Sequence, residues 1–327
     1  MRACSHHMVE KMKIGRIIRI VVSVVLLVSG LVLLAIPSLR EYSIQSQVQD
    51  IEEHLTDKTR VEYDTSTPQE SDPNPSAEDA WSPEALPGLY EEFTTYNQNL
   101  IENGQSVSDA WSGEVSSASV ARYGLDALGV VEIPDMKVKL PLYVNSTNEN
   151  LARGAAVMNG TSMPIGGAST NCVIAAHRGW RGNAYFQFID RMKVGSKVYV
   201  HTPWGKLTYQ AVAVEIITPS ESDKVKIQPD KDMVTLVSCH PYQLGGGPER
   251  YLVYCERYQP NNVSDGAEHS RSEWIEAQAG QELGPDDKKD DLLQLEVYVQ
   301  KYLPPITLVL CGVIVFVRAF RSRKGRS

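Results

Sequence analysis

Three residues with complementary chemistry stand at the ends of apolar runs in this sequence. Cys239 ends the run MVTLVSC, His177 ends CVIAAH, and Arg250 begins RYLVYC. A cysteine nucleophile needs a base and a group that stabilises the charge developing on an attacked carbonyl oxygen. The residue types predict a thiol site with Cys239 as nucleophile, His177 as general acid and base, and Arg250 as the group that holds the substrate or the oxyanion.

The surroundings of Cys239 favour it as the reactive thiol. A glycine-rich segment, QLGGGPER, follows it closely and would place the sulfur beside a flexible loop that a substrate can reach. His240 is its direct neighbour, but neighbouring residues of an extended strand point to opposite faces. His177 is therefore the expected base.

The other cysteines have a different context. Cys4 lies in a basic N-terminal segment, and Cys311 lies in an apolar run near the C-terminus. Cys172 and Cys255 are each inside an apolar strand pattern. They are expected either as buried, inert thiols or as a mutual disulfide, and the sequence leaves both open.

From Gly129 onward, short β-type runs alternate with turn residues. Seven or eight strands within this region favour a single β-barrel or sandwich, with short helical pieces near 147–154 and 184–192. The expected strands cover residues 130–133, 138–144, 172–177, 197–202, 207–217, 233–239 and 250–256.

The segments that flank this region have other patterns. Ile44, Val48, Ile51 and Leu55 recur at helical spacing and predict an amphipathic helix over 40–56. Helices are also expected at 88–102 and 114–128, separated by a polar loop. The division expected from the sequence is a helix and flexible stalk at 40–87, helices and a loop at 88–128, the β-rich unit at 129–258 and an acidic tether at 259–301.

The charge is distributed unevenly along the 327 residues. The net formal charge is −8, but residues 1–19 carry +4 and residues 318–327 carry +5, which leaves −17 for the part between them. A strongly acidic body argues against nucleic acid as a partner of the main domain.

The two basic ends each adjoin an apolar run, which predicts two membrane-spanning helices. The spans are expected at 20–39 and 302–320, with a basic segment at 1–19 and a basic tail at 321–327. By the positive-inside rule both termini would be cytoplasmic and residues 40–301 extracellular. A cleaved signal peptide is the alternative for the first run, and a buried core helix is the alternative for the second.

The motifs around the three site residues resemble those of sortases. HRG at 177–179 is followed by TLVSC at 235–239 and then by RYLV at 250–253, with Arg257 further along. Other segments, including LPLY at 140–143 and GTS at 160–162, are similar to the class C branch that builds pili in Gram-positive bacteria. The resemblance covers about residues 86–258 and the layout with two membrane anchors.

The resemblance implies an eight-stranded sortase barrel and a cysteine transpeptidase. Such an enzyme would cleave an LPxTG-like sorting signal between Thr and Gly through a thioester, and would transfer it to a lysine amine of a pilin subunit. A cell-wall precursor as amine acceptor, a catalytically silent membrane scaffold and a secreted thiol protease are the alternatives. Neither a cofactor nor a metal is expected.

Class C sortases also resemble one another in a lid that carries an Asp-Pro-aromatic tripeptide. Here Asp109, Ala110 and Trp111 follow the helix expected at 88–102. By the resemblance, Asp109 would pair with Arg250 and Trp111 would lie over Cys239. Ala110 replaces the usual proline, which predicts a less rigid lid. The same tripeptide recurs at 79–81, and an exposed loop without a lid role is the alternative interpretation.

Overall fold

The computed structural model describes residues 2–60, 81–112, 120–180, 183–243, 246–258 and 288–321. Most of the expected stalk, the expected tether up to residue 287 and nearly all of the basic tail lie outside these ranges. The chain divides into two compact units. One combines residues 1–41 with 291–327, and the other covers residues 42–290.

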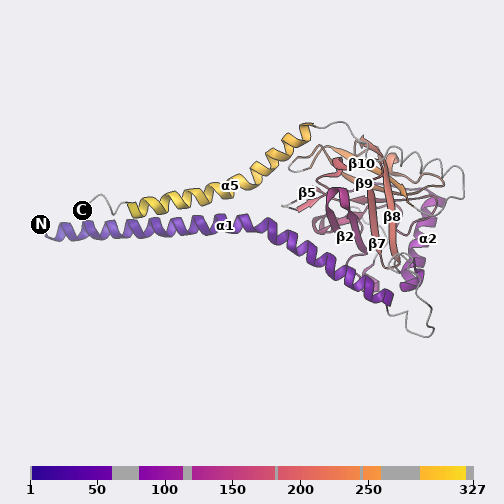
Figure 1. Ribbon diagram of the computed structural model, residues 1–327, viewed down its shortest axis with the longest axis horizontal. Helices are drawn as coiled ribbons and strands as arrows, with labels where there is room; N and C mark the ends of the chain where they lie inside the picture. The colour runs from indigo at the N-terminus through magenta and orange to yellow at the C-terminus, as the bar shows by residue number, and fades with distance from the viewer. Residues whose placement is uncertain are drawn as a thin grey trace, which may run out of the picture. The chain divides into compact units, whose positions relative to one another are not determined.

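The larger unit contains a closed barrel of eight strands, in the order β1-β2-β3-β4-β9-β10-β8-β7 (Figure 1). This confirms the expected barrel. The strands are β1 (Gly129–Ile133), β2 (Val138–Val144), β3 (Ala155–Val157), β4 (Thr170–Ala175), β7 (Lys197–Thr202), β8 (Gly205–Ile217), β9 (Asp232–His240) and β10 (Glu249–Arg257).

Strand β3 was not expected from the sequence. Its three residues pair in parallel with β2 and antiparallel with β4, so it closes the barrel between them. A run of Ala-Ala-Val is too short and too weak in β-propensity to stand out in a sequence. The strand exists because its neighbours supply the pairing.

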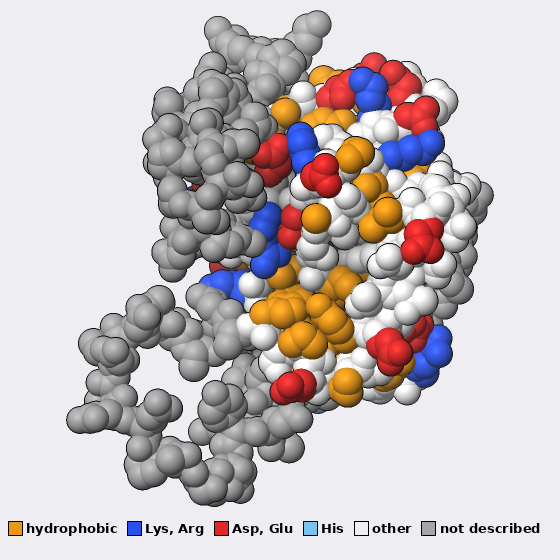
Figure 2. Space-filling model, turned by 90° about the vertical axis from the view of Figure 1, so that its right-hand side faces the viewer, with side chains coloured by type: hydrophobic (Ala, Val, Ile, Leu, Met, Phe, Trp, Pro, Cys, Tyr) orange, Lys and Arg blue, Asp and Glu red, His pale blue; other side chains and the backbone are white. Residues whose placement is uncertain are grey.

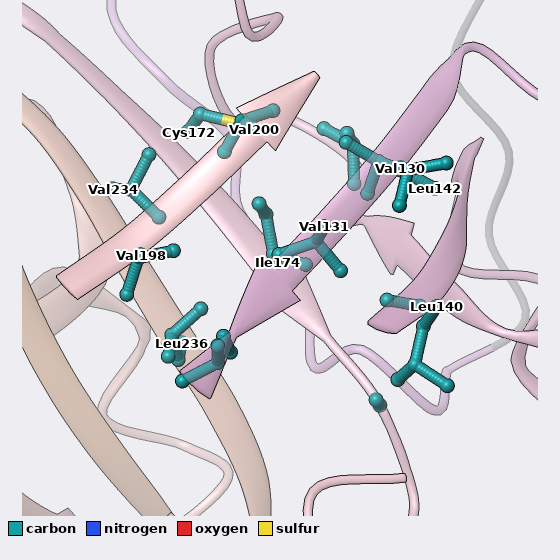
Figure 3. Close-up of a cluster of buried hydrophobic side chains, with 14 of the residues drawn as sticks. Val130, Val131, Leu140, Leu142, Cys172, Ile174, Val198, Val200, Val234 and Leu236 are labelled. Atoms are coloured by element: carbon teal, nitrogen blue, oxygen red, sulfur yellow. The ribbon is translucent and has the colours of Figure 1, made fainter. Parts of the chain in front are cut away.

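Alternate residues of the central strands face two different hydrophobic clusters. Cys172, Ile174, Val234 and Leu236 pack inside the barrel with residues of β1, β2 and β7, as Figure 3 shows. Their chain neighbours, such as Val173 and Val237, belong to a second cluster on the outer face of β4, β9 and β10. Residues of these strands can therefore be assigned to the inner or the outer face by their position.

Helix α2 (Pro87–Asn103) packs against the barrel through aromatic residues. The rings of Tyr90 and Phe93 lie 5.4 and 5.7 Å from the ring of Trp204 in the β7–β8 turn. Trp81, from the tripeptide at 79–81, joins this cluster at 6.2 Å from Trp204. Asn97 exchanges hydrogen bonds with the backbone of Met163. These contacts fix the start of the loop that follows α2.

Two expected helices differ in the structure. Residues 184–192 instead form the end of a hairpin, in which β6 (Asn183–Tyr185) pairs with β5 (Arg178–Trp180), and then the short 3-10 helix η5 (Ile189–Arg191). The φ angle of Tyr185 is +44°, which an α-helix does not allow. For the helix expected at 114–128, residues 113–119 lie outside the described part, and residues 120–128 contain only the 3-10 helix η3 (Ala121–Tyr123). The piece expected near 147–154 is present as helix α3 (Asn148–Arg153).

Helices α1 (Arg2–Arg60) and α5 (Lys288–Arg321) contain segments, at 17–55 and 301–319, that are long and apolar enough to cross a membrane. The amphipathic helix expected at 40–56 is part of α1, and Ile44 and Val48 are buried in the barrel unit. In the other unit, the Ser23 hydroxyl donates to the carbonyl of Gly312 at 2.7 Å. The last part of the expected tether is helical, because α5 begins at Lys288.

The surface of the barrel unit carries both signs of charge. On the face shown in Figure 2, acidic and basic side chains are interspersed among hydrophobic groups. Among the described residues of this face there is no continuous basic stripe of the kind that nucleic acid binding requires.

Cys172 and Cys255 are free, buried thiols. Both are register partners of Val234, one from each side of β9. They are thus two strands apart, which is about 9–10 Å, whereas the Cα atoms of a disulfide are roughly 4.4–6.8 Å apart. Of the two possibilities open from the sequence, the structure selects separate thiols, and burial raises the pKa of each.

We expect Cys172 and Cys255 to stay reduced even in an oxidising buffer, because strand spacing keeps them apart. The full-length protein, denatured and alkylated with iodoacetamide, should carry the label on both cysteines in mass spectrometry. A matched sample treated first with dithiothreitol is the control and should give the same labelling. A peptide pair linked through these two sulfurs would contradict the expectation.

Candidate active site

Three neighbouring strands bring the expected site residues together. Cys239 on β9 and Arg250 on β10 are direct register partners in the antiparallel pair. Strand β4 runs parallel to β9 and pairs Ala175 with Val237, and the amide of Ala176 continues the ladder by donating to Val237. Continuing this register by two residues places His177 level with Cys239.

The three residues share the outer face of the barrel. His177, Cys239 and Arg250 have the same parity as Ala175, Val237 and Leu252 of the outer cluster, so their side chains leave the same side of the sheet. The sequence assigned all three to strand ends, and the pairing of the strands places them side by side.

The Cys239 thiol is almost enclosed, with 8% of the residue exposed. Burial raises its pKa, against the opposing effects of the Arg250 charge and a hydrogen bond from the backbone N–H of Gly247. The glycine-rich loop allows this approach of backbone to sulfur. A Cβ on Gly247 would lie 2.0 Å from the carbonyl oxygen of His240, so no side chain fits there.

The His177 ring lies among aromatic side chains. It stacks on Trp180, with ring centres 4.5 Å apart and planes inclined by 15°. The centre of the Tyr185 ring lies 6.3 Å away, with the two ring planes inclined by 84°. Burial lowers the pKa of His177 to about 4, because the imidazolium loses hydration in this apolar setting. At neutral pH the enclosed ring is uncharged.

Asp109 forms a two-pronged ion pair with Arg250. The guanidinium donates from Nε to Oδ1 at 2.7 Å and from Nη2 to Oδ2 at 2.8 Å. Its Nη1 donates to the carbonyls of Gly247 and Glu249. Paired donation of this kind is the strong form of an arginine–carboxylate contact. The structure contains the contact expected between Asp109 and Arg250, and its role in a lid stays a prediction.

Trp111 lies against two of the site residues. Its ring is 4.6 Å from the Arg250 guanidinium and 6.2 Å from the His177 ring. A direct cover over the Cys239 sulfur stays a prediction. Ala110, in the position of the usual proline, is only 1% exposed and packs into the outer cluster. Packing therefore holds this residue in place of the constraint that a proline ring would impose.

Residues 104–112, here called the lid segment, have a second attachment that the sequence did not reveal. The side-chain amide of Gln105 donates to the carbonyl of Gly160 at 3.1 Å and accepts from the amide of Ile227 at 2.6 Å. A Cβ on Gly160 would lie 2.1 Å from the carbonyl oxygen of Ser106. The glycine at 160, which also has a φ of +76°, was the one available signal.

Within the described residues, no group of three or more His, Cys, Asp or Glu side chains is arranged to hold a metal ion. The chemistry available at this site is that of a thiol, an imidazole and a guanidinium.

A model of the sortase domain matches residues 131–258, which include the whole of this site. The barrel is a sortase domain. Among curated relatives, it is 27% identical over 167 residues to sortase A of Streptococcus agalactiae serotype III (strain NEM316), across 50% of this chain and 66% of the relative. It is 24% identical over 132 residues to sortase D of Bacillus subtilis (strain 168), across 40% of this chain and 64% of the relative. These matches span just under two thirds of each relative's length.

A solved structure of sortase C from Streptococcus pneumoniae is similar in fold. The match has a TM-score of 0.50 and 25% identity, and it covers 65% of this chain and 97% of that structure. That structure was described for insights into catalysis and pilin substrate specificity. The likeness agrees with the eight-stranded sortase barrel seen here.

The lid segment beside this sortase domain should slow the reaction of Cys239 with thiol reagents. We expect Asp109→Ala to raise the rate of Cys239 alkylation about tenfold or more, since a hydrogen bond to a charged group contributes about 1.5–3 kcal/mol. Trp111→Ala should raise the rate severalfold, since it removes a cation–π contact of about 0.5–2 kcal/mol. Labelling by iodoacetamide, mapped by mass spectrometry, measures the rate.

Asp126→Ala is the matched control for this experiment. It removes a carboxylate that also binds an arginine, Arg153, through two hydrogen bonds, but on the surface of the barrel. Its labelling rate should equal that of the unchanged protein. Equal rates for all four proteins would show that the lid segment does not restrict access to the thiol.

Proposed function

We propose that the protein is a membrane-bound cysteine transpeptidase that joins pilin subunits. The observation that carries this proposal is the alignment of Cys239, Arg250 and His177 on one face of three paired strands. The match of residues 131–258 to the sortase domain and the likeness to a sortase C support it.

In the proposed first half-reaction, the Cys239 thiolate attacks the carbonyl carbon of threonine in an LPxTG-like sorting signal. Arg250 stabilises the oxyanion or holds the substrate backbone. The carbon–nitrogen bond to glycine breaks, His177 donates a proton to the leaving amine, and a thioester to Cys239 remains.

In the second half-reaction, an amine attacks the thioester. His177, now neutral, takes a proton from the amine, the carbon–sulfur bond breaks, and the Cys239 thiolate and the protonated His177 are restored. For pilus polymerisation the amine is a lysine side chain of another pilin subunit. An amine of the cell-wall precursor would instead give anchoring of proteins to the wall.

The closed lid segment matches a resting state. With the site enclosed, burial raises the pKa of Cys239 and lowers that of His177, so a neutral thiol and a neutral imidazole are favoured. Arg250 is occupied by Asp109. Displacement of the lid segment would hydrate the site, release Arg250 and bring the two pKa values closer together, which makes the thiolate and imidazolium forms more accessible.

The proposal includes anchoring at both ends. Two helical segments are apolar enough to span a membrane, and a basic cluster adjoins each. This pattern supports a two-pass protein in the cell membrane, with the barrel outside and both termini in the cytoplasm.

We expect Cys239→Ala to abolish covalent capture of a sorting-signal peptide, because the variant lacks the attacking sulfur. The full-length protein in detergent is incubated with the peptide, and its mass is measured intact. Cys172→Ala is the matched control, a second strand cysteine facing the barrel interior, and it should still form the adduct. An adduct on any other cysteine would contradict the assignment.

Incubation with a purified pilin that carries its sorting signal tests the acceptor. A ladder of covalent pilin multimers is the result expected for a polymerase, and replacement of the acceptor lysines by arginine should remove it. Adduct without multimers, but with transfer to a cell-wall precursor, would favour anchoring. No adduct at all would favour a silent scaffold.

A further inference from the structure

A second arginine lies directly behind the site, on the inner face of the barrel. Arg178 follows His177 in the chain and begins strand β5. It is 4% exposed, and its side chain is enclosed almost completely. His240 on β9 and Tyr251 on β10 have the parity of the barrel interior, opposite to that of Cys239 and Arg250.

The Arg178 guanidinium contacts residues of β9 and β10 and the carboxylate of Asp190. Its Nη1 donates to Nδ1 of His240 at 2.9 Å and makes a longer contact, 3.5 Å, with the carbonyl oxygen of Cys239. Its Nη2 lies 3.4 Å from a carboxylate oxygen of Asp190. The guanidinium also covers the ring of Tyr251 at 5.4 Å.

These contacts determine which nitrogen of the His240 ring carries a proton. A guanidinium can only donate, so Nδ1 of His240 must be the accepting nitrogen, and the ring is neutral with its proton on Nε2. The imidazole that adjoins Cys239 in sequence is thus held by Arg178 on the inner face. His177 is left as the imidazole on the same face as the sulfur.

A buried guanidinium is expensive to desolvate, and such a group in this position calls for a reason beyond packing. Arg178 and Arg250 lie on opposite faces at the end of β9, so one cation acts on the thiol from each face of the sheet. Other charged or titratable groups near the sulfur are Asp109 and His177 on the outer face and Asp190 and His240 on the inner face. The Arg178 charge acts to lower the pKa of Cys239, in the same direction as Arg250.

We propose that Arg178 is a positioning residue of the cysteine chemistry, which fixes the end of β9 by hydrogen bonds and stabilises the Cys239 thiolate by its charge from inside the barrel. The proposal rests on the proposed function for its role in turnover. Its effect on the thiol alone does not depend on any peptide substrate.

The test is the pH dependence of Cys239 alkylation in the full-length protein, since the thiolate is the reacting form. Arg178→Gln should move the midpoint of this profile upward by about half a pH unit, which slows alkylation about threefold below the midpoint. Arg178→Lys keeps the charge and should keep the midpoint close to that of the unchanged protein. It loses the planar pair of donors, so kcat with a sorting-signal peptide should fall severalfold while KM is retained.

Arg153→Gln is the matched control. Arg153 also pairs with an aspartate and covers a tyrosine ring, Tyr143 at 4.7 Å, but it lies on α3. Its profile should equal that of the unchanged protein. An unchanged midpoint in a folded Arg178→Gln variant would overturn the charge effect.

If Arg178→Gln does not fold, as judged by thermal unfolding, Arg178→Lys still tests both the positioning role and the charge effect. A folded Lys variant with unchanged kcat would overturn the positioning role, and one with a midpoint raised like that expected for Gln would overturn the charge effect. If the unchanged protein does not turn over the peptide, but the midpoints of the alkylation profiles shift as expected, the proposed function is rejected. The effect of Arg178 on the thiol then still stands.

Discussion

The site depends on the hydrogen bonding of β9 to strands on both of its sides. Parallel pairing with β4 and antiparallel pairing with β10 leave no freedom in the relative heights of His177, Cys239 and Arg250. A shift of one residue in either ladder would turn a side chain to the opposite face. The interior side chains of these strands oppose such a shift, since Val234, Leu236 and Val253 would then leave the core.

The same alternation separates two kinds of polar group at the barrel end. The outer face carries the thiol, the neutral imidazole and the arginine that the lid segment holds. The inner face carries Arg178 and His240, enclosed next to Tyr251. Side chains of adjacent residues point to opposite faces. His177 and Cys239 therefore lie on the outer face, whereas their sequence neighbours Arg178 and His240 lie on the inner face.

Much of the barrel could be predicted from the sequence because alternating apolar residues mark each of the longer strands. The strand at 138–144 and that at 197–202 were predicted with the observed ends. Strand β3 could not be found, since its pairing comes from its neighbours. The helical piece predicted at 184–192 is replaced by the end of β6, a turn and η5. Tyr185, Phe186 and Ile189 have a spacing that also occurs on one face of a helix, and in the structure all three are buried.

For the site, residue type and position at a strand end identified Cys239, His177 and Arg250, and the family resemblance supplied Asp109 and Trp111. No sequence pattern indicated the roles of Gln105 and Arg178. A glutamine in a polar loop has no distinctive pattern, and its role depends on backbone groups at Gly160 and Ile227 that are distant in the chain. Arg178 stood inside a motif, but only the fold reveals that its charge points inward.

The two attachments of the lid segment differ in kind. Asp109 is held by the charged side chain of Arg250, whereas Gln105 is held by uncharged backbone groups of Gly160 and Ile227. Release of Asp109 from Arg250 would therefore leave the segment fixed at Gln105, so that it would turn about this pivot instead of detaching as a whole.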